Sequence, residues 1–284
     1  MKQRFHRLAR RFPAKRAFIT GASSGLGLEL ARALGSEGWT LGLFDRNVER
    51  LAHVEAELSV AGLTVLAYPG DVINADELTV AVNSFAATHD GLDVMINNAG
   101  VAGSGTLMEV PLEDWRWIVD INFMGVVHGA RAAIPHLQRN GAGLLINVAS
   151  AAAFASAPGM ISYNATKAAV LSLSETLSGE LAASGTQVSV VMPTYFQTSL
   201  LESFRGPPTA LEQAAQLMQG SSYSAANVAR DVLLQASAGR MHIVLPASAR
   251  MLWRLKRWAP RFFLRQVLAL RERMRAGQAN PPQA

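Results

Sequence analysis

Short apolar runs alternate along this sequence with segments that are long enough to form a helix. The runs that we predict as strands are residues 17–20, 40–44, 65–68, 94–97, 143–148, 188–191 and 242–245. Helix-sized segments such as 26–34 and 170–183 lie between them. Because parallel strands need a crossover connection, usually a helix, this alternation favours a parallel sheet. We therefore predict an α/β fold of the Rossmann type, with one doubly wound parallel sheet of about seven strands and helices on both faces.

The composition supports one globular unit and limits its surroundings. The chain has 284 residues, half of them hydrophobic, and no repeat or linker divides its body. It contains no cysteine, which excludes disulfides and thiolate chemistry and fits a reducing compartment. No apolar stretch approaches the roughly 18 residues of a membrane-spanning helix, and the N-terminus lacks a signal-peptide core. We therefore expect a cytoplasmic protein, with the inner face of a membrane as an alternative location.

The formal net charge of +5 is distributed unevenly. Residues 1–16 carry seven Lys or Arg and no acid, and residues 250–275 carry nine Lys or Arg against Glu272 alone. The remainder of the chain therefore has a net charge of −10. A nucleic-acid-binding protein would carry its basic residues on the folded body, so we expect no nucleic-acid partner. The two basic ends instead suggest an anionic membrane surface or the acidic body of another subunit.

A glycine-rich segment, TGASSGLG at residues 20–27, follows the first predicted strand directly and leads into a predicted helix. Glycines at such a turn let the backbone approach a pyrophosphate, which the N-terminus of the helix stabilises. An ordinary strand-to-helix turn could look the same, but this one opens the first βαβ unit, and an acid, Asp45, ends the next strand. Asp45 can bind the ribose hydroxyls of NAD(H), whereas Arg46 could pair with the 2′-phosphate of NADP(H). We favour NAD(H), with NADP(H) as the alternative cofactor.

The heptapeptide ISYNATK at residues 161–167 places a tyrosine four residues before a lysine, at the head of a run that resembles a buried helix. Four residues is just over one helical turn, so Tyr163 and Lys167 can share a face of that helix. Taken alone, the pair could also be a surface aromatic beside an unrelated charge, because this spacing is common by accident.

Three motifs in this order, TGASSGLG, NNAG at residues 97–100 and YNATK, resemble the short-chain dehydrogenase/reductase family. The match is to the shorter branch of that family, with its TGxxxGxG glycine motif, and it covers about residues 15–246. The resemblance implies a catalytic domain over this range, with a substrate lid at about residues 199–223. A basic extension at residues 1–14 would precede the domain, and a basic amphipathic tail at 247–284 would follow it. The resemblance also implies assembly into a homodimer or homotetramer.

The resemblance assigns many residues to the cofactor. In the glycine motif these are Gly21, Ser23, Ser24, Gly25, Leu26 and Gly27. The others are Asp45, Arg46, Asp71, Val72, Asn98, Ala99, Gly100, Tyr163, Lys167, Pro193 and Thr198. Asp71 and Val72 would hold the adenine ring, and Thr198 the nicotinamide carboxamide. Residues 97–100 would close the fourth strand against the cofactor, although alone they could be a plain turn.

The same resemblance implies a catalytic set of Asn122, Ser150, Tyr163 and Lys167. Hydride transfer to a ketone leaves an alkoxide that must be protonated as it forms. A free phenol, with a pKa of about 10, is a poor base at neutral pH, and a lysine one turn away favours the phenolate and lowers that pKa. Ser150 would donate a hydrogen bond to the substrate oxygen, although outside this context it could be a strand-end cap. Asn122 would position a water that connects Lys167 to solvent.

Two further features concern the substrate side. Thr194 stands where the family commonly has glycine, which puts the local backbone conformation in question. Apolar side chains of the predicted lid could line a pocket for an apolar substrate or pack the lid onto the body. They are Leu200, Leu201, Phe204, Leu211, Leu217 and Met218. The six histidines show no metal-ligand spacing, so we expect no metal.

The tail contains two predicted helical segments, residues 249–258 and 261–275, with Pro260 between them. Arginines recur there at steps of three or four residues, beside an apolar stripe that includes Met251, Leu255, Trp258 and Phe262. This basic amphipathic pattern is typical of a helix at a membrane surface. The stripe could equally pack on its own subunit or on a neighbouring one.

The sequence therefore predicts an NAD(P)-dependent oxidoreductase that interconverts a secondary alcohol and a ketone, with an apolar or lipid-like substrate. A narrower alternative is a 3-oxoacyl thioester reductase, which would favour NADPH and against which Asp45 weighs. A second alternative is a non-catalytic protein that senses NAD(P) by binding it. The presence of all four catalytic positions argues against this last alternative.

Overall fold

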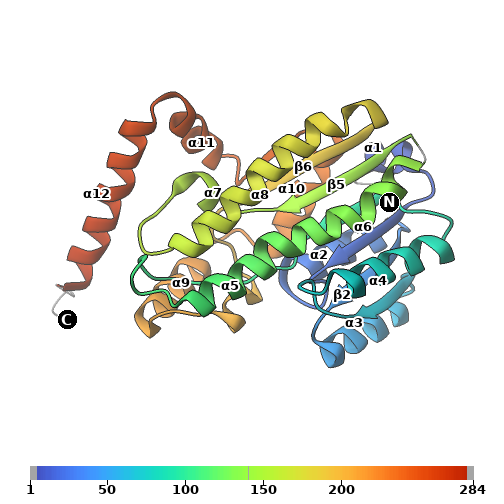
Figure 1. Cartoon of the computed structure of the whole chain (residues 1–284), viewed down its shortest axis with the longest axis horizontal. Helices are drawn as coiled ribbons and strands as arrows, with labels where there is room; N and C mark the ends of the chain where they lie inside the picture. The colour runs from blue at the N-terminus through green and yellow to red at the C-terminus, as the bar shows by residue number, and fades with distance from the viewer. Residues whose placement is uncertain (1–4, 140, 280–284) are drawn as a thin grey trace.

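The structure is a computed structural model that describes residues 5–139 and 141–279 (Figure 1). Within these residues, seven parallel strands form one sheet in the order β3-β2-β1-β4-β5-β6-β7. The strands are β1 (Arg16–Thr20), β2 (Thr40–Asp45), β3 (Val65–Pro69), β4 (Val94–Asn97), β5 (Gly143–Val148), β6 (Thr186–Pro193) and β7 (His242–Leu245). The predicted parallel sheet is confirmed.

The bounds of the strands differ from the prediction by two residues at most. The largest difference is at β6, which extends to Thr186 at one end and to Pro193 at the other. Thr186 pairs with Gly143 of β5, and Pro193 pairs with Leu245 of β7. A polar residue and a proline resemble loop residues in the sequence, but the neighbouring strands supply the pairing that extends β6.

The strand order brings the carboxyl ends of β1 and β4 side by side near the centre of the sheet. From β1 the chain moves outward through β2 to β3, and then returns to β4 on the other side of β1. Open α/β sheets bind their ligands in the crevice that such a reversal leaves at the carboxyl ends of the strands. The topology alone therefore indicates where the candidate site lies.

Helices cover both faces of the sheet, as predicted. The helices of the described residues are α1 (His6–Arg11), α2 (Gly25–Gly35), α3 (Val48–Val60), α4 (Ala75–Thr88), α5 (Leu112–Val119), α6 (Gly125–Arg139), α7 (Ala152–Ala155), α8 (Ile161–Glu180), α9 (Pro208–Gln219), α10 (Ala225–Ser237), α11 (Ala249–Trp258) and α12 (Pro260–Ala279). A π-helical turn η1 (Asp120–Met124) and two 3₁₀ turns, η2 (Ala182–Ser184) and η3 (Ser199–Ser203), complete them. The core residues place α2, α3 and α10 on one face and α4, α6 and α8 on the other.

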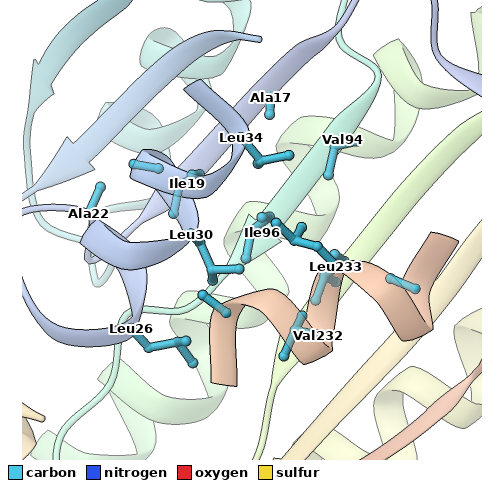
Figure 2. Packing of buried hydrophobic residues seen from close by; sticks show 14 of the residues in the cluster. Ala17, Ile19, Ala22, Leu26, Leu30, Leu34, Val94, Ile96, Val232 and Leu233 are labelled. Atoms are coloured by element: carbon cyan, nitrogen blue, oxygen red, sulfur yellow. The ribbon is translucent and has the colours of Figure 1, made fainter. Parts of the chain in front are cut away.

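The core follows the alternation of side chains along each strand. On β1, Ala17 and Ile19 are buried on the face of α2 and α10, whereas Phe18 is buried on the opposite face beside Phe85 of α4. Figure 2 shows the first of these cores, where leucines of α2 lie between the strands β1 and β4 and the helix α10. Burial on both faces explains why the strands are nearly continuous apolar runs.

Part of the predicted N-terminal extension packs against the domain. Leu8 and Phe12 are buried in the core together with Trp39, and the ring centroids of Phe12 and Trp39 are 6.5 Å apart. Arg11 donates a hydrogen bond of 3.1 Å to the backbone oxygen of Gly185, directly before β6. Leu8 and Phe12 therefore anchor the described part of the extension in the core of the domain.

Leu8→Ala is expected to lower the free energy of unfolding by about 3 kcal/mol, because Leu8 is only 1 % exposed and its truncation leaves a cavity. Leu234→Ala on α10 is the matched control, since this leucine is 41 % exposed, and it should change the free energy by less than about 0.5 kcal/mol. Urea unfolding followed by circular dichroism measures both changes. Equal effects of the two substitutions would contradict a contribution of α1 to the core.

The predicted C-terminal helical extension is present and forms a hairpin, which we call the C-terminal hairpin (α11 and α12). It lies at the opposite end of the molecule from α1 (Figure 1). α11 has the predicted bounds, and α12 begins at Pro260 because proline fits the first turn of a helix, where its missing N–H is not needed. In the described part of the chain, no helix combines the length and the hydropathy that crossing a bilayer requires.

Candidate active site

The glycine-rich loop places the N-terminus of α2 at the carboxyl end of β1. Gly25, the first residue of α2, has a φ of +52°, and a Cβ atom there would lie 2.5 Å from Oγ1 of Thr198. A Cβ atom on Gly27 would lie 2.1 Å from the backbone oxygen of Gly21. The turn therefore needs glycine at both positions. The first N–H groups of α2 have no partners within the helix, so the loop fits a pyrophosphate.

Asp45 lies at the end of β2, beside this loop. Its Oδ2 accepts a hydrogen bond of 3.1 Å from the backbone N–H of Ser23, and its Oδ1 accepts one of 3.0 Å from the N–H of Asn47. These two bonds orient the half-buried carboxylate toward the glycine-rich loop. An acid held there fits the ribose hydroxyls of a dinucleotide.

Residues 97–100 connect the carboxyl ends of β1 and β4. The side-chain amide of Asn98 donates hydrogen bonds to the backbone oxygens of Thr20 (2.9 Å) and Gly21 (3.1 Å). The backbone N–H groups of Asn98 and Ala99 donate to Oγ1 of Thr20 at 3.0 Å and 3.1 Å. The segment is thus more than a plain turn, because it holds the glycine-rich loop against β4.

Asn122 lies in the π-helical turn η1, between α5 and α6. Its side chain is fully buried and bonds the backbone of Val101 twice: Oδ1 accepts from the N–H at 2.8 Å and Nδ2 donates to the oxygen at 2.9 Å. Nδ2 also lies 3.3 Å from Oγ1 of Thr166, the neighbour of Lys167. Asn122 therefore fastens the segment after β4 to the helix that carries Lys167. Its predicted role in positioning a water stays a prediction.

Ser150, Tyr163 and Lys167 meet at the carboxyl end of β5. Oγ of Ser150 accepts a 3.1 Å hydrogen bond from the N–H of Ala152, so the strand-end cap is present, and the same side chain is close enough to Tyr163 to oppose the rise in its pKa. On α8, Nζ of Lys167 lies 5.8 Å from the ring centroid of Tyr163 and donates a 3.1 Å hydrogen bond to the backbone oxygen of Val148. Tyr163 and Lys167 are only 7 % and 3 % exposed, so they are not an accidental pair on the surface.

Burial dominates the ionisation of this pair. Removal from water raises the pKa of Tyr163 to about 12, although the hydrogen bond with Ser150 opposes the rise. Removal from water also lowers the pKa of Lys167 to about 8. Removal from water is the largest cause of the raised pKa of the phenol. The sequence predicted a lowering of this pKa by Lys167 together with the positive charge of a bound nicotinamide, and that lowering stays a prediction.

A cavity of about 800 Å³ joins the dinucleotide region to Ser150, Tyr163 and Lys167. All the predicted site residues line this cavity except Gly27 and Asn122, which contact the residues of its wall. Asp71 and Val72, predicted to hold an adenine ring, lie at its edge after β3.

The predicted lid is tied to the dinucleotide side of the cavity. The contacts are Ser199 Oγ to Ser24 Oγ at 2.8 Å, Arg46 Nη2 to Ser203 Oγ at 3.1 Å, and Arg50 Nη1 to Glu202 Oε2 at 2.9 Å. Arg46, the alternative partner for a 2′-phosphate, is therefore directed toward the lid in this structure.

Four of the six apolar lid residues line the cavity, and the other two are exposed. Leu200, Leu201 and Phe204 line the cavity and also pack against the second core, and Met218 lines the cavity as well. The remaining two, Leu211 and Leu217, are exposed, and neither lines the cavity.

The segment after β6 accommodates Thr194 in place of the common glycine. Thr194, which replaces the common glycine, does not have a positive φ, and its N–H donates a 2.9 Å hydrogen bond to the backbone oxygen of Leu245. The next residue, Tyr195, lines the cavity, and its hydroxyl lies 3.9 Å from the sulfur of Met160. Tyr195 was not among the residues predicted for the site.

The C-terminal hairpin supplies a further wall of the cavity, which was not predicted from the sequence. Its lining residues are Leu252, Leu255, Phe263, Gln266 and Val267. They face lining residues of α7 such as Phe154, and Phe263 is only 4 % exposed. The apolar stripe of the tail was the feature that could have indicated this, since one side of it packs on its own subunit. Among the described residues, no cluster of His, Asp or Glu is placed to hold a metal ion.

Comparison with known proteins points to one family. The sequence pattern of the short chain dehydrogenase family matches residues 15–207. An uncharacterized oxidoreductase of Staphylococcus aureus strain USA300 is 34% identical over 190 residues, which cover 67% of this chain and 81% of the relative. A 3-oxoacyl-[acyl-carrier-protein] reductase of S. aureus strain Mu50 is 30% identical over 190 residues, which cover 66% of this chain and 77% of the relative.

Solved structures of similar shape carry either nicotinamide cofactor. A short chain dehydrogenase/reductase from Burkholderia phymatum in complex with NAD has a TM-score of 0.81 and 29% identity, and the match covers 86% of this chain and 92% of that one. An alcohol dehydrogenase from Thermococcus sibiricus complexed with 5-hydroxy-NADP has a TM-score of 0.71 and 26% identity, and the match covers 81% of this chain and 95% of that one.

Proposed function

The chain belongs to the short-chain dehydrogenase family, and we propose that it is a nicotinamide-dependent oxidoreductase that interconverts a secondary alcohol and a ketone. The observation that carries this proposal is that Ser150, Tyr163 and Lys167 line the same cavity as the glycine-rich loop and Asp45. A dinucleotide needs the loop and the acid, whereas only a reaction needs the buried hydroxyl groups and amine.

The groups around Tyr163 fit proton transfer to a substrate oxygen. A bound nicotinamide dinucleotide supplies the hydride. Ser150 donates a hydrogen bond to the substrate oxygen and stabilises the negative charge that develops there. Tyr163, protonated because its pKa is about 12, gives its proton to that oxygen. Lys167, whose pKa of about 8 keeps it charged at neutral pH, then stabilises the phenolate.

We propose NAD(H) as the preferred cofactor, with NADP(H) as the alternative. The support is the carboxylate of Asp45, which the N–H groups of Ser23 and Asn47 hold beside the loop and which would repel a 2′-phosphate. Arg46 is the residue that could accommodate that phosphate, but here it bonds the lid.

Asp45→Asn is expected to reduce the preference for NADH over NADPH by about tenfold, because the amide lacks the negative charge that repels a 2′-phosphate. A tenfold change corresponds to roughly 1.4 kcal/mol of free energy. The measurement is kcat/KM for each cofactor at a saturating concentration of ketone. Arg50→Gln, which removes a charge from the same rim of the cavity, is the control and should leave the cofactor ratio closer to that of the unsubstituted protein. An unchanged ratio in Asp45→Asn would show that Asp45 does not determine the cofactor preference.

The lining of the cavity supports an apolar, lipid-like substrate. Phe154, Leu200, Leu201 and Phe263 contribute apolar side chains from three separate parts of the chain. A pocket of this character binds its ligand mainly by burying apolar surface and orients it with a few polar groups. The narrower candidate is a 3-oxoacyl thioester, since a curated relative at 30% identity is a reductase of that substrate class.

The direct test is oxidation of NADH and NADPH with a series of methyl ketones of increasing chain length and with a 3-oxoacyl thioester. Rates that rise with chain length support the lipid-like ketone, and the highest rate with the thioester supports the narrower candidate. Binding of a cofactor without turnover of any substrate would instead make the protein a nucleotide sensor.

We further propose that the protein acts in the cytoplasm as a homodimer or homotetramer. The support is the resemblance to a family in which such assemblies are common, together with a chain that contains no cysteine. Light scattering coupled to size-exclusion chromatography distinguishes these states from a monomer.

A further inference from the structure

We propose that the C-terminal hairpin docks on the surface of an anionic bilayer and gives an apolar substrate a path from that bilayer into the catalytic cavity. The substrate part of this inference rests on the proposed function. The docking part rests on the hairpin alone.

The inner side of the hairpin belongs to the cavity. Phe263 is buried, and Leu255 and Val267 are partly buried against the cluster that contains Phe154. All three hairpin residues line the same cavity as Tyr163. The inner side of the hairpin is therefore anchored to the body through these contacts.

The outer side of the hairpin exposes large apolar side chains. Trp258 is 88 % exposed, Met251 76 % and Phe262 54 %. Trp258 and Phe262 flank the junction of α11 and α12, where the chain turns away from the body of the molecule (Figure 1). Side chains of this size in one exposed region mark an interaction surface.

The charge on the hairpin fits an anionic partner. Arg254, Arg261 and Arg265 are exposed, and none of them forms an ion pair with the described side chains. Among the described side chains of the hairpin, Arg257 alone forms an ion pair with an acid on the body, with 3.8 Å to Glu175. Unpaired arginines beside exposed tryptophan and phenylalanine are the combination that binds headgroups while the rings enter the interface. An anionic bilayer would repel the acidic remainder of the chain and attract the basic hairpin, so the protein would approach the bilayer with the hairpin first.

The exposed side and the cavity are continuous. Leu252 is 50 % exposed and also lines the cavity, and Gln266 is likewise exposed and lines it. An apolar molecule that leaves a bilayer beside Trp258 would therefore meet apolar side chains along the hairpin and could reach Tyr163 without crossing bulk water. This continuity favours a bilayer over a second copy of the chain as the occupant of the surface.

Sedimentation with vesicles tests the docking. The full-length protein is mixed with vesicles of phosphatidylcholine alone or with one third phosphatidylglycerol. Binding is expected only to the anionic vesicles. It should fall by about tenfold or more in the variant Arg254→Glu/Arg261→Glu/Arg265→Glu and in Trp258→Ser/Phe262→Ser. The matched controls are Arg7→Glu/Arg10→Glu on α1, the other basic end, and Met108→Ser, another highly exposed apolar residue.

Activity tests the substrate path separately. With a long-chain ketone carried in anionic vesicles, the two hairpin variants should lose rate in proportion to their loss of binding. With a short water-soluble ketone their rates should stay unchanged, because the substituted residues do not line the cavity. Absence of turnover with every ketone overturns the substrate path together with the proposed function, whereas the sedimentation result stands independently.

Three results overturn the docking proposal. The first is equal vesicle binding by the hairpin variants and the unsubstituted protein. The second is loss of binding in the α1 control to the same extent. The third is a change of oligomeric state in Trp258→Ser/Phe262→Ser with no change in vesicle binding, which would assign the surface to a second copy.

Discussion

Tyr163→Phe is expected to lower kcat for ketone reduction by about a thousandfold, because the substitution removes the proton that the substrate oxygen receives. The affinity for NADH should stay nearly unchanged, since the phenyl ring keeps the shape of the buried side chain. Stopped-flow or steady-state oxidation of NADH measures the first quantity, and fluorescence titration of NADH measures the second.

Tyr195→Phe is the matched control, because Tyr195 lines the same cavity without a neighbouring lysine. Its kcat should remain near that of the unsubstituted protein. If the two tyrosine variants lost turnover equally, or if Tyr163→Phe kept full turnover, the assignment of the proton donor would be wrong.

The pKa of Tyr163 also predicts a difference between the two directions of reaction. At neutral pH the phenol holds its proton, since its pKa is about 12, and it is ready to protonate an alkoxide. Alcohol oxidation needs the phenolate instead, so its rate should rise with pH through the alkaline range. Bound oxidised nicotinamide, with its positive charge, would bring this rise to lower pH.

Lys167→Met is expected to lower kcat by about a hundredfold or more, because the ammonium that stabilises the phenolate is lost. The same substitution should change the dependence of stability on pH. The pKa of Lys167 falls from 10.5 to about 8 on folding, so between these values the unfolded chain holds a proton that the folded chain has released. The free energy of unfolding of the unsubstituted protein therefore rises with pH in this window, by on the order of 3 kcal/mol in all.

Tyr163 acts in the opposite direction at higher pH. Its pKa rises from 10.0 to about 12 on folding, so above pH 10 the folded chain keeps a proton that the unfolded chain has lost, and stability falls. Measurements between pH 7 and pH 10 therefore isolate the lysine.

The measurement is the difference in urea-unfolding free energy between Lys167→Met and the unsubstituted protein at each pH. The amount by which the unfolding free energy of Lys167→Met exceeds that of the unsubstituted protein should shrink as the pH rises. Lys15→Met is the control, since Lys15 also donates to a backbone oxygen, that of Glu37 at 2.8 Å, but is only partly buried. Both differences are measured over the same range of pH. A constant difference for Lys167→Met would mean that the lysine is not desolvated.

The sheet could be predicted from the sequence because its physics is local. The strands are buried on both faces, apart from the partly buried edge strand β3, so they are apolar runs in the sequence, and the glycine-rich turn identifies the first of them. The bounds of α11 were predictable for a similar reason, since a proline stops and restarts a helix at a defined place.

The parts that were missed depend on contacts between distant segments. The π-helical turn at Asn122 goes with hydrogen bonds to Val101 and Thr166, which no local pattern in the sequence shows. The wall that the C-terminal hairpin adds to the cavity needs the tertiary placement of Phe263. The raised pKa of Tyr163 is a burial effect, and the spacing of a tyrosine and a lysine carries no information on burial.

The contacts between the lid and the glycine-rich loop have a thermodynamic consequence. Ser199 Oγ lies 2.8 Å from Ser24 Oγ, and a Cβ atom on Gly25 would lie 2.5 Å from Oγ1 of Thr198, so the glycine-rich loop and the start of the lid are in direct contact. If a ligand on the glycine-rich loop changes these contacts, its binding is coupled to that of a ligand beneath the lid. The factor by which the first ligand changes the affinity for the second then equals the factor by which the second changes the affinity for the first. A substitution at these contacts would therefore alter the binding of both ligands.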